Sequence, residues 1–95
     1  MNDIFYKQTF NCLVRDRERI LYQGQAYALT THNEQGKLDI LPEHTHFISI
    51  IQQFLDIIQI DGKVLSIPVS KGILKVVEND ARVYLGIFSA ASKAR

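Results

Sequence analysis

Two histidines one residue apart, His44 and His46, have the spacing in this sequence that best suits metal chemistry. On an extended backbone, residues two apart point to the same face of a strand, so both imidazoles could reach one zinc ion. The third ligand would have to come from His32, Glu43 or Cys12, because no histidine follows position 46. We therefore assign no metal ligand, read the pair as part of a surface that contacts a partner, and keep a His-x-His metal site as the alternative.

Nucleophilic and phosphate-binding chemistry lack their usual motifs. A catalytic Ser or Cys needs a His and an orienting acid within reach, and no Ser or Cys of this chain lies in a glycine-flanked turn. Five glycines are scattered singly at positions 24, 36, 62, 72 and 86, so a glycine-rich phosphate loop is excluded. Cys12 lies in the apolar run 10–14 and is predicted to be a small buried residue. The sequence predicts no catalytic residue and no cofactor.

Length and composition predict a single globular domain. The chain has 95 residues, 46% of them hydrophobic and 22% charged, with a formal net charge of +1. A nearly neutral chain gives no electrostatic argument for binding nucleic acid. A lone cysteine excludes a disulfide scaffold and favours a reducing compartment. No apolar run approaches the roughly 18 residues needed to span a bilayer, and the start lacks a secretory signal, so we expect a soluble intracellular protein.

Short apolar runs, separated by turn residues every 8 to 12 positions, predict an all-β sandwich or barrel. Asp61 and Gly62 lie between two β-branched runs and predict a hairpin with a type I′ turn. Asn79 and Asp80 predict a second tight turn, and Gly72 marks the entrance to the strand that precedes it.

Residues 47–60 carry a conflicting pattern. Their polar residues recur at spacings typical of a helix, at Ser49, Gln52, Gln53, Asp56 and Gln59. Six isoleucines within the same segment favour a strand. We favour strand-turn-strand here and keep a helical turn within 47–60 as the alternative.

Three segments, in order, resemble the N-terminal β-sandwich domain of the F-type ATP synthase epsilon subunit, which is called delta in mitochondria. Residues 18–24, ERILYQG, are similar to the family's Glu-Arg-x-Leu/Val-Tyr/Phe-x-Gly element. Residues 36–51, GKLDILPEHTHFISII, resemble its Gly-x-Leu/Phe-Gly/Asp-Ile-Leu-Pro-Gly-His-x-Pro motif. Residues 70–76, SKGILKV, match its Ser-Gly-Gly-Ile/Phe-Leu/Val-x-Val motif. The resemblance covers residues 10 to 87 and implies a small flattened sandwich of about ten short strands.

The chain also departs from the family pattern. Glu43 stands where Gly is usual, and His46 where Pro is usual. The family continues after the sandwich into an inhibitory two-helix hairpin, whereas this chain stops at Arg95. We expect a sandwich domain over residues 1–88, a short tail over 89–95, and no inhibitory hairpin.

The resemblance implies a non-catalytic rotor subunit in the central stalk of a proton- or sodium-translocating ATP synthase. Such a subunit joins the gamma subunit to the ring of c subunits and lies peripherally at the cytoplasmic face of the membrane. The residues expected to face the c-ring are Gly36, Lys37, Pro42, Glu43 and His44. Those expected to face gamma are Arg15, Arg17 and Ser49. The alternative is a stand-alone β-sandwich binding module with or without a metal at the His-x-His pair.

Overall fold

The computed structural model describes residues 8–42 and 46–86, and all regular structure in them is β-strand. The strands are β1 (Phe10–Arg15), β2 (Ile20–Asn33), β3 (Gly36–Ile40), β4 (His46–Gln59), β5 (Val64–Val77) and β6 (Asp80–Leu85). No helix long and apolar enough to cross a bilayer occurs in these two ranges. The predicted all-β class is confirmed, and the predicted tail over 89–95 lies outside the described residues.

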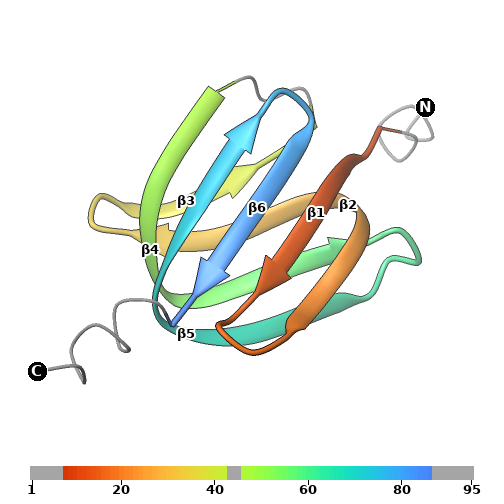
Figure 1. Cartoon of the computed structure of the whole chain (residues 1–95). Helices are drawn as coiled ribbons and strands as arrows, with labels where there is room; N and C mark the ends of the chain where they lie inside the picture. Colours follow the sequence, from red (N-terminus) through yellow and green to blue (C-terminus); the bar gives the residue numbers. More distant parts are fainter. Residues whose placement is uncertain (1–7, 43–45, 87–95) are drawn as a thin grey trace, which may run out of the picture.

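The six strands form one sheet that closes on itself. Its order is β1-β6-β5-β4-β2-β3, and β1 pairs with β2 as well. The long strands β4 and β5 bend and so belong to both layers of the resulting sandwich (Figure 1). We call β1, β6, the second half of β5 and the first half of β4 the front sheet. The back sheet contains β3, the second halves of β2 and β4, and the first half of β5.

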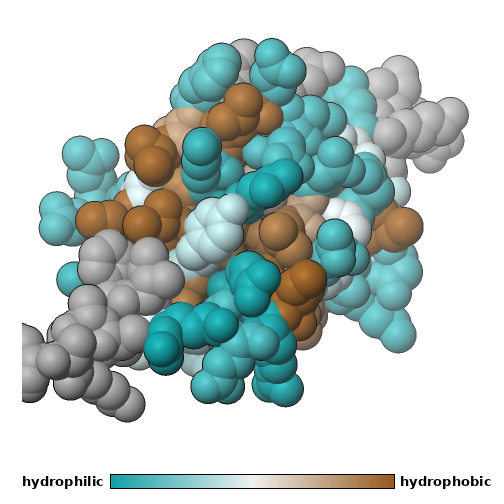
Figure 2. Space-filling model, in the orientation of Figure 1, coloured by the Kyte–Doolittle hydropathy of each residue, from teal (hydrophilic) through white to brown (hydrophobic). Residues whose placement is uncertain are grey.

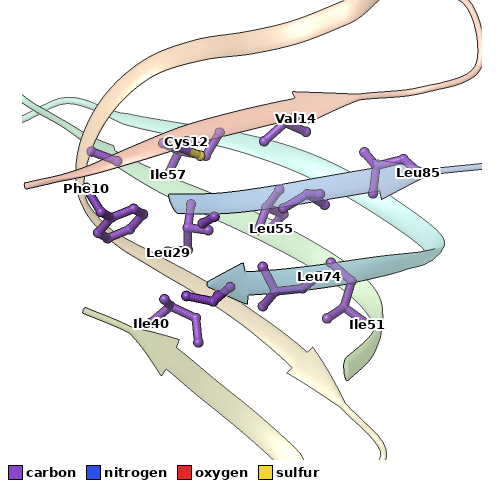
Figure 3. Packing of buried hydrophobic residues seen from close by; sticks show 14 of the residues in the cluster. Phe10, Cys12, Val14, Leu29, Ile40, Ile51, Leu55, Ile57, Leu74 and Leu85 are labelled. Carbon is purple, nitrogen blue, oxygen red and sulfur yellow. The ribbon is translucent and has the colours of Figure 1, made fainter. Parts of the chain in front are cut away.

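The core fills the space between the two sheets. Cys12 and Val14 enter it from β1, while Leu29, Leu55 and Leu74 enter it from β2, β4 and β5 (Figure 3). Between the register shifts of β2 and β4, alternate residues of the strands point inward, as the period of two requires. Cys12 is buried and free of any disulfide, as predicted from its place in an apolar run.

The predicted number of about ten short strands is wrong, because three of the six strands are long. β2, β4 and β5 each contain 14 residues. β4 is one strand with a register shift between Ile51 and Gln53, and not strand-turn-strand or a helical turn. Gln53 has φ +76 at this β-bulge. The bulge places two neighbouring glutamines at the bend, which interrupts the alternation of β4 and produces the apparent helical spacing.

β5 bends at the same level, and Gly72 permits this bend. The register shift opposite Gln52 lets both Val69 and Gly72 face the core. A Cβ at position 72 would lie 2.7 Å from Leu85 Cδ2 and 2.9 Å from the Tyr84 carbonyl oxygen. Any larger residue would therefore push β6 away. Gly72 lies in the middle of β5 and not at a strand entrance as predicted.

The two predicted turns exist, with different details. Gly62 N donates to Gln59 O at 2.9 Å, and Gly62 has φ +88, whereas Asp61 does not have a positive φ. This hairpin is therefore a type I turn followed by a left-handed glycine, and not the predicted type I′ turn. The second connection consists of Glu78 and Asn79, because Asp80 already begins β6.

Candidate interaction surfaces

The residues predicted to face the c-ring do not form one compact patch. Gly36 follows the β2–β3 turn with φ +125 and, with the exposed Lys37, begins β3. Pro42 lies beyond the other end of β3, and a strand rises about 3.3 Å per residue, so roughly 20 Å separates it from Gly36. Glu43 and His44 lie outside the described residues. The structure therefore places Lys37 and Pro42 at opposite ends of one short strand.

One buried side chain and a side-chain hydrogen bond hold β3 in place between those ends. Ile40 is buried in the core, and Thr30 Oγ1 of β2 donates to Asp39 Oδ1 at 2.7 Å. The β2–β3 turn is fixed by Gln35 N, which donates to Asn33 Oδ1 at 2.9 Å. Leu41, directly after the strand, exposes 56% of its surface. Because Leu41 adjoins Pro42, it belongs to the same end of β3, and it was not predicted as a contact from the sequence.

The residues predicted to face gamma lie on different faces. Arg15 ends β1 on the outer face of the front sheet, opposite Tyr84 of β6. Ser49 of β4 shares the inward side with Ile51, and Asn33 Nδ2 donates to its Oγ at 3.1 Å. Arg17 is exposed in the turn between β1 and β2. Arg15 and Arg17 are therefore neighbours, and Ser49 points to the opposite side of the sheet.

Asp16 organises the turn that carries Arg17. Asp16 Oδ1 accepts hydrogen bonds from the backbone N–H groups of Glu18 at 2.8 Å and Arg19 at 2.9 Å. These two bonds stabilise the carboxylate and lower the pKa of Asp16 below its usual value. The turn thus has a defined conformation that presents Arg17 to solvent.

The front sheet has an outer face on which four strands align their side chains in rows. One row contains Ile50, Ile73, Tyr84 and Arg15, and the next contains Ile48, Lys75, Arg82 and Leu13. The third row contains His46, Val77, Asp80 and Asn11. We call these twelve residues the front face. No register shift interrupts the β4–β5, β5–β6 and β1–β6 ladders over these rows, so neighbouring side chains lie about 5 Å apart.

Charge and hydrophobicity are distributed unevenly over the front face. Ile48, Ile50 and Val77 are 68%, 50% and 39% exposed, and apolar atoms gather at the left margin in Figure 2, where the first half of β4 lies. Asp80 Oδ2 accepts from Arg82 Nε at 3.0 Å, and this bond raises the pKa of Arg82. The front face therefore has an apolar margin on β4 and a more polar region toward β6 and β1.

The two isoleucines of this margin were not predicted from the sequence as surface residues. Strict alternation from the inward-facing Ser49 would have placed Ile48 and Ile50 together on the opposite side. That signal was present, but the helical spacing of the surrounding polar residues obscured it.

The alternative metal pair is not assembled in the described part of the chain. His46 is exposed on the front face, whereas the His32 ring lies against Phe54 with ring centres 6.4 Å apart. No three His, Cys, Asp or Glu side chains gather as metal ligands within residues 8–42 and 46–86. Burial, together with the nearby Asp80 carboxylate, raises the pKa of Cys12 to about 12, so its thiol stays protonated at neutral pH. Of the candidate ligands, Glu43 and His44 lie outside the described residues.

Comparisons with known proteins agree with this architecture. Residues 9–87 match the family described as "ATP synthase, Delta/Epsilon chain, beta-sandwich domain". The ATP synthase epsilon chain of a Nitratiruptor species is 32% identical over 65 residues, which are 67% of this chain and 50% of that protein. This chain thus spans about half the length of that curated relative.

Two solved structures show the same fold. A chain of the Euglena gracilis mitochondrial ATP synthase, OSCP/F1/c-ring in rotational state 1, matches with a TM-score of 0.75 and 14% identity. That match covers 90% of this chain and 61% of the Euglena chain. A chain of the Tetrahymena thermophila mitochondrial ATP synthase central stalk and c-ring matches with a TM-score of 0.67 and 13% identity, covering 82% and 63% of the two chains.

Proposed function

Because the chain belongs to the ATP synthase delta/epsilon β-sandwich family, we propose that it is a non-catalytic subunit of the central stalk of an F-type ATP synthase. In that role it joins gamma to the c-ring and lies peripherally at the cytoplasmic face of the membrane through the complex. The observation that carries the proposal is the family match over residues 9–87, which includes every strand.

The closed sheet suits a part that transmits torque. Every strand pairs with at least one neighbour over its length, and the ladders around β1, β6, β5, β4 and β2 form a ring. Closure removes most free strand edges, so the domain resists shear better than an open sheet. A coupling element needs such a stiff body with binding surfaces at two places, and it needs no catalytic pocket.

We propose that the two contacts use different parts of this body. The c-ring contact involves the segment after β3, where Pro42, Glu43 and His44 follow the exposed Leu41. The gamma contact involves Arg15 and Arg17 at the β1–β2 turn. The geometry does not support including Gly36 and Lys37 in the c-ring contact, because they lie at the far end of β3. It does not support including Ser49 in the gamma contact, because Ser49 lies on the inward side of β4.

Reconstitution tests the proposal. Purified gamma, the detergent-solubilised c-ring and this chain are mixed, and the bound fraction is measured for the wild type, His44→Ala and a matched control. Lys63→Ala is the control because Lys63 is exposed in the β4–β5 hairpin, away from β3. We expect His44→Ala to weaken ring binding and Lys63→Ala to leave it unchanged, with both variants melting like the wild type. No binding of the wild type to gamma at micromolar concentration would overturn the proposed function.

A second measurement addresses regulation. We propose that residues 1–95 support assembly without suppressing ATP hydrolysis, since in the family inhibition belongs to a helical hairpin and the matched region is the sandwich. Hydrolysis by gamma and the catalytic subunits should stay unchanged when the chain is added. Strong suppression would contradict this part of the proposal.

A further inference from the structure

The closed sheet still leaves four stretches of strand edge without a ladder partner among the described residues. They are β3, the first half of β2, the first half of β5, and residues 48–51 of β4. An unpaired edge presents N–H and C=O groups to any other strand, and soluble proteins usually protect such edges with charges, proline or bulges. The four edges can therefore be compared by how well they are protected.

Three of the edges carry protective residues. β3 has the charged Lys37 and Asp39, and Pro42 follows it. The free half of β5 contains Pro68, which has no N–H to donate. The free half of β2 starts directly after Arg19, and its Gln25 carbonyl accepts from the Tyr22 hydroxyl at 2.7 Å. Each of these edges thus disfavours the approach of another strand.

The edge at residues 48–51, which we call the β4 edge, carries no charge and no proline, and the bulge at Gln52 and Gln53 lies beyond its end. It arises because β2 leaves β4 at the pair His32 and Gln52 and continues beside β3. No Lys, Arg, Asp, Glu or Pro occurs from His46 to Leu55. Ile48 and Ile50 expose 68% and 50% of their surface. In Figure 1 this half of β4 is the left margin of the front sheet.

There is also open space beside the β4 edge. An open groove of about 360 Å³ runs between it and the β2–β3 turn, lined by Asn33, Glu34 and Gln35 on one side and by Ile48, Ser49 and Ile50 on the other. Asn33 Nδ2 bridges the groove by donating a hydrogen bond to Ser49 Oγ at 3.1 Å. A strand added to the front sheet at this margin would extend the sheet alongside the groove.

We propose that the β4 edge pairs antiparallel with the same edge of a second copy of this chain. In an antiparallel ladder, directly opposite residues share a face, so a two-fold axis between identical strands must lie midway between a residue and the same residue of the other copy. An axis at Ser49 places Ile48 opposite Ile50 of the partner subunit, and the reverse, which covers both exposed isoleucines. An axis at Ile50 would instead place Ile48 opposite Gln52 of the partner subunit, where the bulge interrupts the ladder.

The absence of charged residues on the β4 edge favours a second copy of this chain as the partner. A self-pairing strand places each charged side chain near the same charge on its copy, and the β4 edge has no charge to repel. The two-fold contact uses the edge of both copies, and the remaining edges are protected, so association stops at a dimer. The inference concerns the isolated chain and does not depend on the proposed function.

Cross-linking tests the position of the axis. Ser49→Cys places two thiols directly opposite each other, with Cα atoms at the separation that a disulfide requires. Ser66→Cys is the matched control, because Ser66 is exposed on the protected edge of β5. With oxidised glutathione as oxidant, we expect Ser49→Cys to form a covalent dimer much faster than Ser66→Cys. The native Cys12 is buried and stays unmodified. Equal rates for the two variants would overturn the proposal.

Sedimentation tests the association itself. The wild type should change from monomer to dimer as its concentration rises through the micromolar range. Ile48→Lys should stay monomeric, because a lysine on the edge is brought near the partner's apolar Ile50. Val64→Lys, at a residue 54% exposed on the β5 edge, should dimerise like the wild type. A wild type that stays monomeric throughout, an Ile48→Lys variant that dimerises as well, or growth beyond the dimer would each overturn the proposal. Circular dichroism checks that both variants are folded.

Discussion

The two halves of β4 have similar apolar residues in very different surroundings. The second half lies between β2 and β5, and its inward Leu55 and Ile57 are completely buried. The first half pairs with β5 alone within the described residues, and its outward Ile48 and Ile50 are largely exposed. The bulge at Gln52 and Gln53 separates the two halves. Ile51, which points inward from the first half, is also completely buried, whereas among the outward isoleucines Ile58 of the second half is half-buried and Ile48 and Ile50 are exposed. The comparison teaches that the side of the sheet decides whether an isoleucine is in the core, and that a second neighbouring strand decides how exposed an outward isoleucine is.

The largest expected effect is the difference in the free energy of unfolding between an Ile→Ala substitution in the second half of β4 and one in the first half. Ile57→Ala removes a fully buried side chain and should lower the free energy of unfolding by about 2–5 kcal/mol. Ile48→Ala, at a residue 68% exposed, should change it by less than about 0.5 kcal/mol in the monomer. Urea unfolding at low protein concentration measures both values. Similar losses for the two variants would show that Ile48 is packed as tightly as Ile57 and would break the comparison.

A smaller change in the free energy of unfolding is expected when the contact between β2 and β4 at the bulge is removed. Thr31 is fully buried, and its Oγ1 donates to the Phe54 carbonyl oxygen at 2.6 Å. Thr31→Val keeps the shape but leaves that carbonyl without this donor, which should cost about 1–3 kcal/mol. Thr31→Ser retains the hydroxyl and is the control for the bond. If denaturant unfolding gave no larger loss for Thr31→Val than for Thr31→Ser, the hydrogen bond would not be what stabilises this contact.

The smallest expected effect is a difference in stability between the same substitution made at each of the two glutamines of the bulge. Gln53 has φ +76, a conformation that a β-branched residue strongly disfavours. Gln53→Val should therefore destabilise the fold by about 1 kcal/mol more than Gln52→Val. Thermal unfolding of the two variants gives the difference. A Gln53→Val variant as stable as Gln52→Val would mean that the bulge can shift along β4, and the boundary between the halves would not be fixed.

Much of the fold follows from local patterns. Alternation around Cys12 correctly places it in the core, and the turn residues at Gly62 and Asn79 mark the two connections on either side of β5. The family resemblance, which rests on three short motifs, is confirmed over residues 9–87. Each of these inferences uses residues close together in the chain, where the backbone period and turn chemistry act directly.

The arrangement of the candidate surface residues could not be predicted from the sequence, because a surface combines residues from several strands. Arg15 and Ser49 were assigned to one interface, yet they point to opposite sides of the front sheet. Gly36 and Pro42 were assigned to one interface, yet β3 separates them. Motif order along the chain does not contain the strand register, and only the register decides which side chains become neighbours.

The sequence by itself determined the all-β class, the burial of Cys12 and the family, since these depend on turn residues, alternation and short motifs. Only the tertiary structure decided that β4 is a single strand and that half of it lacks a second neighbour. The physical reason is that backbone pairing depends on residues far apart in the chain. β2 leaves β4 at Gln52 because its last residues pair with β3 instead, and nothing in the local pattern of residues 48–51 records that choice.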